Sequence, residues 1–252
     1  MIPADLIGVD GPTLAIAAAM TFGAALIRGF TGFGMAIILV PLLGLLIPPQ
    51  QAVVLAIILQ LLIGPVGLRA ILADADRASA IPIGLIAMAT TPLGMALLTA
   101  VESDLARLLI ALVALGAFGA MLLPQHAAGH RPRRAMVGAT GITSGILTGF
   151  AAMPGPPVVP FYLRQKIDPA VARASMMLIF FATAIAGTLA AWWAGIAYRG
   201  IFLMGIALFL PMWAGNRLGG RAFGRVPAPL WRAIVGGVLG VAALGALLRL
   251  AA

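Results

Sequence analysis

The stretch Arg28-Gly29-Phe30-Thr31-Gly32-Phe33-Gly34 places an arginine and three glycines between two strongly apolar runs, Leu14 to Ile27 and Met35 to Ile47. An arginine at bilayer depth costs roughly 2.5–3.5 kcal/mol, so it usually faces a cavity or an anion. Glycines let the backbone leave helical geometry, which is tolerated at that depth only where protein or water covers the opened chain. The stretch therefore predicts a break in a membrane helix, with a charged group beside it.

Composition indicates a helical membrane protein. Hydrophobic residues make up 62% of the 252 residues and charged residues 9%, whereas a soluble domain averages about 45–50% and about 25%. The mean hydropathy is +1.12, and the continuous apolar runs argue against a β-barrel. Basic residues gather in the cytoplasmic loops of membrane proteins, which explains the net charge of +9. We therefore expect the lipid bilayer, and no nucleic acid, as a partner.

Ten apolar segments follow one another along the chain. They run at about 11–27, 35–47, 51–68, 80–100, 105–123, 135–150, 155–163, 170–194, 199–216 and 230–248. A full crossing needs about 20 residues, so the segments at 35–47 and 155–163 are too short. We expect each of them to form a broken or re-entrant pair with the segment before it. The other six are long enough to cross.

The basic residues divide unequally between the two sets of loops. One set holds Arg69, Arg77, Arg131, Arg133, Arg134, Arg164, Lys166, Arg173, Arg217, Arg221, Arg225 and Arg232, and the other holds Arg107, Arg199 and Arg249. Because cytoplasmic loops carry the excess of basic residues, the first set is predicted to be cytoplasmic. In a multi-pass protein of the bacterial inner membrane, both termini would then lie on the periplasmic side.

The two halves of the chain also resemble each other. Thr31-Gly32-Phe33 matches Thr148-Gly149-Phe150, and Leu93-Gly94 matches Leu218-Gly219. Chance matching of Gly- and Ala-rich sequence is the alternative, but the two motifs keep the same order. Because the first half begins outside and the second inside, the repeat would be inverted, a recurring plan of secondary transporters.

The predicted fold is thus an all-α polytopic membrane protein of about 8–10 membrane segments. The chain 1–252 is a single transmembrane domain, with inverted repeats at about 11–123 and 135–249. Each repeat is a broken or re-entrant helix pair followed by three transmembrane helices.

A second break, from Thr148 through Pro154-Gly155-Pro156-Pro157, is expected to face the first. The candidate substrate-binding residues are Arg28, Gly29, Thr31, Gly32, Phe33, Gly34, Thr148, Gly149, Phe150, Pro154, Gly155 and Pro156. The Arg28 guanidinium can hold an oxyanion by paired, charge-assisted hydrogen bonds, or it can snorkel to a lipid headgroup. Gly32, Gly34 and Gly155 can free backbone N–H groups at helix starts, or serve close helix packing.

Several polar residues have simpler interpretations. The hydroxyls of Thr31 and Thr148 can donate to an anion, but such hydroxyls more often bond a carbonyl of their own helix. Gln60 and Asn216, in otherwise apolar segments, are predicted to form interhelical hydrogen bonds. Asp168 followed by Pro169 predicts a helix start.

Signatures of catalysis are missing from the sequence. It has no P-loop, no Gly-x-Ser-x-Gly, no His-Glu-x-x-His and no cysteine. His126 and His130 stand in a basic loop without a further ligand. We therefore predict no enzyme activity, no catalytic residue, no metal and no cofactor.

The glycine motifs resemble those of the sulfite exporter TauE/SafE family. The resemblance rests on Gly29-Phe30-Thr31-Gly32-Phe33-Gly34 with Pro41, and on a counterpart comprising Gly141, Ser144-Gly145, Thr148-Gly149 and the run to Pro160. It implies a secondary transporter for the export or uptake of a small sulfur- or carbon-containing anion, such as sulfite or an organosulfonate, across the inner membrane, and of the two directions we expect export. An anion channel, a proton-coupled permease for small carboxylates, and an intramembrane enzyme or assembly factor stay open as alternatives. A homo-oligomer stays open too.

Overall fold

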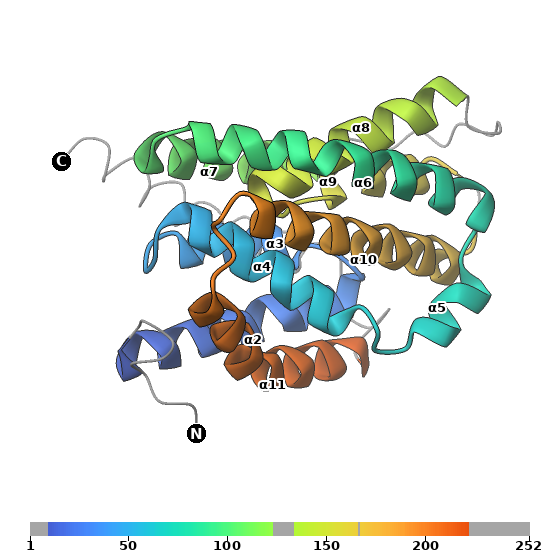
Figure 1. Cartoon of the computed structure of the whole chain (residues 1–252). Helices are drawn as coiled ribbons and strands as arrows, with labels where there is room; N and C mark the ends of the chain where they lie inside the picture. The colour runs from blue at the N-terminus through green and yellow to red at the C-terminus, as the bar shows by residue number, and fades with distance from the viewer. Residues whose placement is uncertain (1–9, 123–133, 166, 222–252) are drawn as a thin grey trace.

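The computed structural model describes residues 10–122, 134–165 and 167–221, and all regular structure in these ranges is helical (Figure 1). The helices are α2 (Gly11–Thr31), α3 (Met35–Leu43), α4 (Pro49–Ile63), α5 (Leu68–Asp74), α6 (Arg77–Ala100), α7 (Ser103–Leu122), α8 (Arg134–Ala151), α9 (Gly155–Leu163), α10 (Pro169–Trp193) and α11 (Arg199–Arg221). Four of them, α2, α6, α10 and α11, are long and apolar enough to cross a membrane, and the bent pair α4–α5 makes a fifth candidate. The predicted all-helical membrane fold is confirmed.

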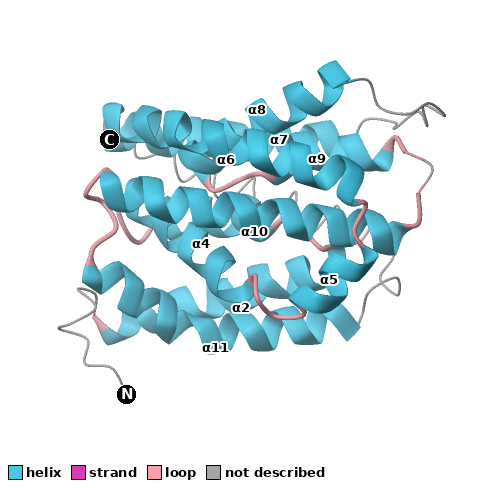
Figure 2. Ribbon diagram, turned by 45° about the vertical axis from the view of Figure 1, so that its right-hand side comes forward, coloured by secondary structure: helices cyan, strands magenta, loops and turns pink. Residues whose placement is uncertain are grey.

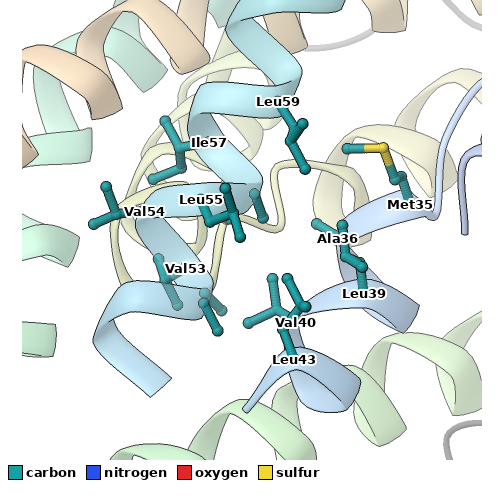
Figure 3. Close-up of a cluster of buried hydrophobic side chains, with 14 of the residues drawn as sticks. Met35, Ala36, Leu39, Val40, Leu43, Val53, Val54, Leu55, Ile57 and Leu59 are labelled. Atoms are coloured by element: carbon teal, nitrogen blue, oxygen red, sulfur yellow. The ribbon is translucent and has the colours of Figure 1, made fainter. Parts of the chain in front are cut away.

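The helices form three layers (Figures 1 and 2). α2 and α11 pack together on one side, α6 and α8 pack together on the other, and α4 and α10 lie between the two pairs. The short helix α3 packs on α4 in the middle of the molecule. Figure 3 shows the apolar side chains at this contact, among them Met35, Leu39 and Val40 of α3 and Val53 and Leu55 of α4.

In each of the two outer pairs, α2–α11 and α6–α8, glycines bring the two helices into backbone contact. A Cβ at Gly29 of α2 would overlap the carbonyl oxygen of Asn216 in α11, and a Cβ at Gly149 of α8 would overlap that of Thr91 in α6. Small residues allow this close approach, which is a common basis of helix association in membranes. Gly29 and Gly149 therefore serve close helix packing.

Two predicted boundaries are wrong. The apolar segment 51–68 does not continue as one straight crossing, because α4 ends at Ile63 and the chain turns by 82° into α5. Proline at position 65 interrupts the helical hydrogen bonding, and Gly67 adopts a positive φ of 77°. In addition, α2 continues to Thr31, so Arg28 lies in the last turns of a helix and the backbone opens only after it.

The described arginines of the predicted cytoplasmic set gather at one end of the bundle, which we call the arginine-rich end. They are Arg69, Arg77, Arg134, Arg164, Arg173, Arg217 and Arg221. Hydrogen bonds join the elements there: the backbone N–H of Asp76 donates to Ser175 Oγ at 2.8 Å, and Ser79 Oγ lies 2.9 Å from the Tyr162 hydroxyl. Arg107 lies at the opposite end, where its Nε donates to the carbonyl of Gly44 at 2.8 Å.

Helix bounds recur in the two halves at one interval of 120 residues. The pairs of positions are 31 and 151, 35 and 155, 43 and 163, and 49 and 169. This register pairs Arg28 with Thr148, whereas the sequence match paired Thr31 with Thr148. The difference of three residues is almost one helical turn, so the two alignments place similar small residues on the same face.

The short helices α3 and α9 leave the centre toward opposite ends of the bundle. The end of α3 is bonded by Arg107 of α7, and the end of α9 contacts Ser79 near the start of α6. The 24-residue α6 separates these two places. Such opposed half-helices are what an inverted repeat requires, although the repeat as a whole stays a prediction. The segment 230–248, the histidines His126 and His130, and Arg131, Arg133, Lys166, Arg225, Arg232 and Arg249 lie outside the described residues.

The orientation in the membrane can be tested with single cysteines, because the chain has none of its own. A cysteine at exposed Arg164, or near Arg131, is expected to react with an impermeant maleimide only from the cytoplasm. One at exposed Glu102 is expected to react only from the periplasm. Labelling of both positions from one face would contradict the predicted orientation and the inverted repeat with it.

Candidate functional site

The two helix breaks meet at a central cavity. Its lining residues are Arg28, Phe33, Gly34, Met35, Ala36, Ile37, Gln60, Ala152, Met153, Pro154, Gly155 and Phe180. Positions 33 to 35 of the first break therefore lie across from positions 153 to 155 of the second. Gln60 of α4 and Phe180 of α10 complete the wall at equivalent places in the two halves. Its volume is about 20 Å³, roughly the room of one water molecule.

Arg28 brings the charge to this cavity. Its side chain is only 6% exposed, and Nη1 donates to Asn216 Oδ1 of α11 at 2.9 Å. In the part of the chain that the structure describes, an ion pair is recorded for Arg107 with Asp104 but none for Arg28. The guanidinium is thus buried against a neutral amide, and a buried charge is favourable only when it is paired. The interhelical hydrogen bond predicted for Asn216 is confirmed.

The start of α3 adds backbone donors to the cavity wall. Gly32 and Gly34 have φ angles of 84° and 87°, a conformation that glycine adopts without a steric penalty. They turn the chain so that α3 begins at the cavity, and no side chain caps its first turn. The N–H groups of Met35, Ala36 and Ile37 have no carbonyl partner within the helix. A helix start also carries about half a positive charge.

The second break is held in a defined shape. Ala152 is the only described residue other than glycine with a positive φ, at 58°, which is uncommon for a side chain with a Cβ. Gln60 Nε2 donates to its carbonyl oxygen at 3.0 Å, and Ser144 Oγ donates to that of Pro154 at 3.0 Å. The hydrogen bond predicted for Gln60 is found, but its partner lies in the break between α8 and α9 instead of in a second helix.

The family model of the sulfite exporter TauE/SafE matches residues 17–246, which is most of the chain and includes both breaks. The chain belongs to this family. No curated protein and no solved structure matches it in the same comparisons. TauE/SafE membership identifies a membrane transport protein, consistent with the several candidate membrane spans.

The predicted site residues of this TauE/SafE protein fall into two groups. Arg28, Phe33, Gly34, Pro154 and Gly155 line the central cavity, whereas Gly29, Thr31, Gly32, Thr148, Gly149, Phe150 and Pro156 do not. The Thr31 hydroxyl donates to the carbonyl of Ile27 at 2.8 Å and accepts the N–H of Phe33 at 3.2 Å. The Thr148 hydroxyl donates to the carbonyl of Ser144 at 2.7 Å. Both threonines therefore support the helix ends beside the cavity.

Sequence reasoning missed other parts of the site. Phe180 carries no motif signal of its own, although the interval of 120 residues relates it to Gln60. The start of α3, in contrast, follows the glycines that predicted free N–H groups at a helix start. Arg173 was assigned to a cytoplasmic loop, which is wrong because α10 already begins at Pro169. The carboxylate of Asp168 accepts the N–H of Ala170 at 2.7 Å, so the predicted helix start is confirmed. The sequence could have placed Arg173 in this helix, because Arg173 lies one turn after the helix start that Asp168 and Pro169 predict.

Proposed function

We propose that this TauE/SafE family member binds a small oxyanion in the central cavity and carries it out across the bacterial inner membrane. Sulfite and organosulfonates are the substrates that the family points to. The observation that carries the proposal is that Arg28 is buried at the junction of two helix breaks and forms no ion pair with a carboxylate of the described residues. A positive charge in that position is stabilised when an anion binds.

The geometry offers three kinds of donor to such an anion. The guanidinium fork of Arg28 suits the paired oxygens of a sulfite or sulfonate group. The N–H groups of Met35, Ala36 and Ile37 come from α3, and the N–H of Gly155 comes from α9. Pro156 and Pro157 have no N–H, so most backbone donors come from α3. Since the cavity holds only about one water molecule here, anion binding requires that α3, α9 or Phe180 move apart.

The driving force follows from the placement of the acidic residues. In the described ranges they are Asp10, Asp74, Asp76, Glu102, Asp104 and Asp168, and each stands at or next to a helix end. Proton-coupled carriers commonly place a titrating group within the membrane. We therefore propose uniport driven by the membrane potential. At about 150 mV, negative inside, a monovalent anion gains about 3.5 kcal/mol on leaving, a gradient of a few hundredfold.

The test is sulfite efflux from proteoliposomes whose internal pH is held fixed, so that the protonation of the enclosed sulfite does not change. We expect a saturable flux that follows a potassium–valinomycin potential and does not respond to an imposed pH gradient. Liposomes that lack the protein are the control, and their sulfite flux is subtracted from that of the proteoliposomes. Accumulation driven by a pH gradient at zero potential would replace uniport by proton coupling, as in a carboxylate permease. A flux that does not saturate would instead indicate an anion channel.

A further inference from the structure

We infer that Arg173 forms a second, outer site for the anion, at a cavity separate from the central one. The inference rests on the proposed function. The second cavity, which we call the vestibule, lies at the arginine-rich end between the α4–α5 bend, α5 and the start of α10. Arg173 and Asp74 are the charged residues that line it. None of the residues predicted from the sequence motifs lines this cavity.

The two cavities differ greatly in size. The vestibule has a volume of about 260 Å³, whereas the central cavity has about 20 Å³. A small oxyanion such as sulfite is larger than one water molecule, so in this conformation it has room beside Arg173 and not beside Arg28. The vestibule is therefore the place where an anion coming from the arginine-rich end can bind first.

One face of α10 connects the vestibule with the central cavity. Arg173 and Met177 line the vestibule, and Phe180 lines the central cavity. These three positions are spaced i, i+4 and i+7, so they share a helix face. The distance from Arg173 to Phe180 along the helix is about 10 Å. An anion released from Arg173 toward the central cavity thus travels a distance of about two helical turns.

Arg173 also contacts the break that carries Arg28. Its Nη2 donates to the carbonyl oxygen of Gly29 at 2.8 Å, and its methylene groups lie against Gly32. The last carbonyls of a helix have no partner within the helix. Arg173 supplies the missing hydrogen-bond donor to the carbonyl of Gly29. An oxyanion in the vestibule would compete with this neutral carbonyl, because hydrogen bonds between two charged groups are stronger. Binding at Arg173 would then loosen the turn that holds Arg28.

Asp74 supplies an opposing charge on the vestibule wall. Its side chain is exposed at the end of α5, and a carboxylate near the guanidinium disfavours a second anion. The pair predicts opposite effects of two substitutions. Removal of Arg173 should weaken anion binding in the vestibule, and removal of the Asp74 charge should strengthen it. A purely structural role of Arg173 as a helix cap predicts no effect of Asp74.

The experiment is calorimetric titration of the purified full chain with sodium sulfite at fixed pH and ionic strength. An Arg28→Ala background removes the central site. We expect this variant to retain one weak sulfite site, which Arg28→Ala/Arg173→Ala weakens at least tenfold further. Arg28→Ala/Asp74→Asn should bind about two- to fivefold more tightly than Arg28→Ala. The matched control is Arg28→Ala/Arg69→Ala, which removes an exposed α5 arginine at the same end and should stay within twofold.

The outer site would be overturned by an absence of sulfite binding in Arg28→Ala, or by equal affinities in Arg28→Ala and Arg28→Ala/Arg173→Ala. Size-exclusion profiles report whether each variant is folded. Arg28→Ala/Asp74→Asn separates the two interpretations of Arg173, because it leaves Arg173 in place: tighter binding than in Arg28→Ala supports the site, and unchanged binding overturns it. Absence of sulfite binding to the unmodified chain would overturn the proposed function itself.

Discussion

Arg28→Ala is expected to weaken sulfite binding by about 100-fold or more while the protein stays folded. Each hydrogen bond between charged groups contributes about 1.5–3 kcal/mol, and the guanidinium fork makes two. The fold tolerates the change because the substitution also removes a buried charge that is bonded to the neutral amide of Asn216. Titration of the purified protein with sulfite measures the affinity, and thermal unfolding measures the stability.

The control for Arg28→Ala is Arg217→Ala. Arg217 is exposed on α11 beside Asn216, and its guanidinium lies 5.4 Å from the ring centroid of Trp213. Its loss removes the same charge close by without changing the cavity, so the affinity should stay within about threefold, since exposed charges are screened. Arg28→Lys should recover little, because an ammonium lacks the planar fork. Full affinity in Arg28→Ala would reduce Arg28 to a structural contact between α2 and α11.

Gly149→Ala is expected to destabilise the protein by about 1–3 kcal/mol, toward the upper end of that range. The added Cβ would overlap the carbonyl oxygen of Thr91 and crowd the backbone N–H of Met95. Backbone atoms of α6 cannot turn away as a flexible side chain can, so α8 and α6 must separate. Thermal unfolding in detergent should show a midpoint lower by about 5 °C or more.

Each close-packed glycine has a matched control on the same helix. Gly138 of α8 and Gly23 of α2 have nothing within 4 Å of an added Cβ. Gly138→Ala and Gly23→Ala should therefore be neutral or stabilising, since alanine favours helix by about 1 kcal/mol. Gly29→Ala should behave like Gly149→Ala, because its Cβ would overlap the carbonyl of Asn216. Equal midpoints for Gly149→Ala and Gly138→Ala would contradict the backbone contact between α6 and α8.

Local signals in the sequence predicted most of the fold. Apolar length and prolines placed α9 at Gly155–Leu163, in agreement with the structure, and glycines placed both breaks. The bend after Ile63 was missed because the apolar run continues through it, although Gly64-Pro65 is a turn signal within that run. The sequence match between the halves differs by three residues from the interval at which the helix bounds recur, because similar small residues recur every helical turn.

The site was predictable only as far as each residue carries its own signal. Arg28 is conspicuous because it is a charge in an apolar segment. Its partner Asn216 and the contact of Arg173 with Gly29 join segments that lie far apart in the sequence. Hydrophobic periodicity shows which face of a helix is buried but not which helix covers it. Those pairings therefore required the structure.

The most direct test of the central claim is a crystal structure of the protein grown with selenite, the selenium analogue of sulfite. The chain has no cysteine for selenite to oxidise, and selenium can be located by its anomalous scattering. We expect the strongest selenium peak between the two breaks, with selenite oxygens at about 2.7–3.2 Å from the Arg28 guanidinium nitrogens and the first-turn N–H groups of α3. A selenite that binds the protein in solution but gives no peak beside Arg28 would contradict the account.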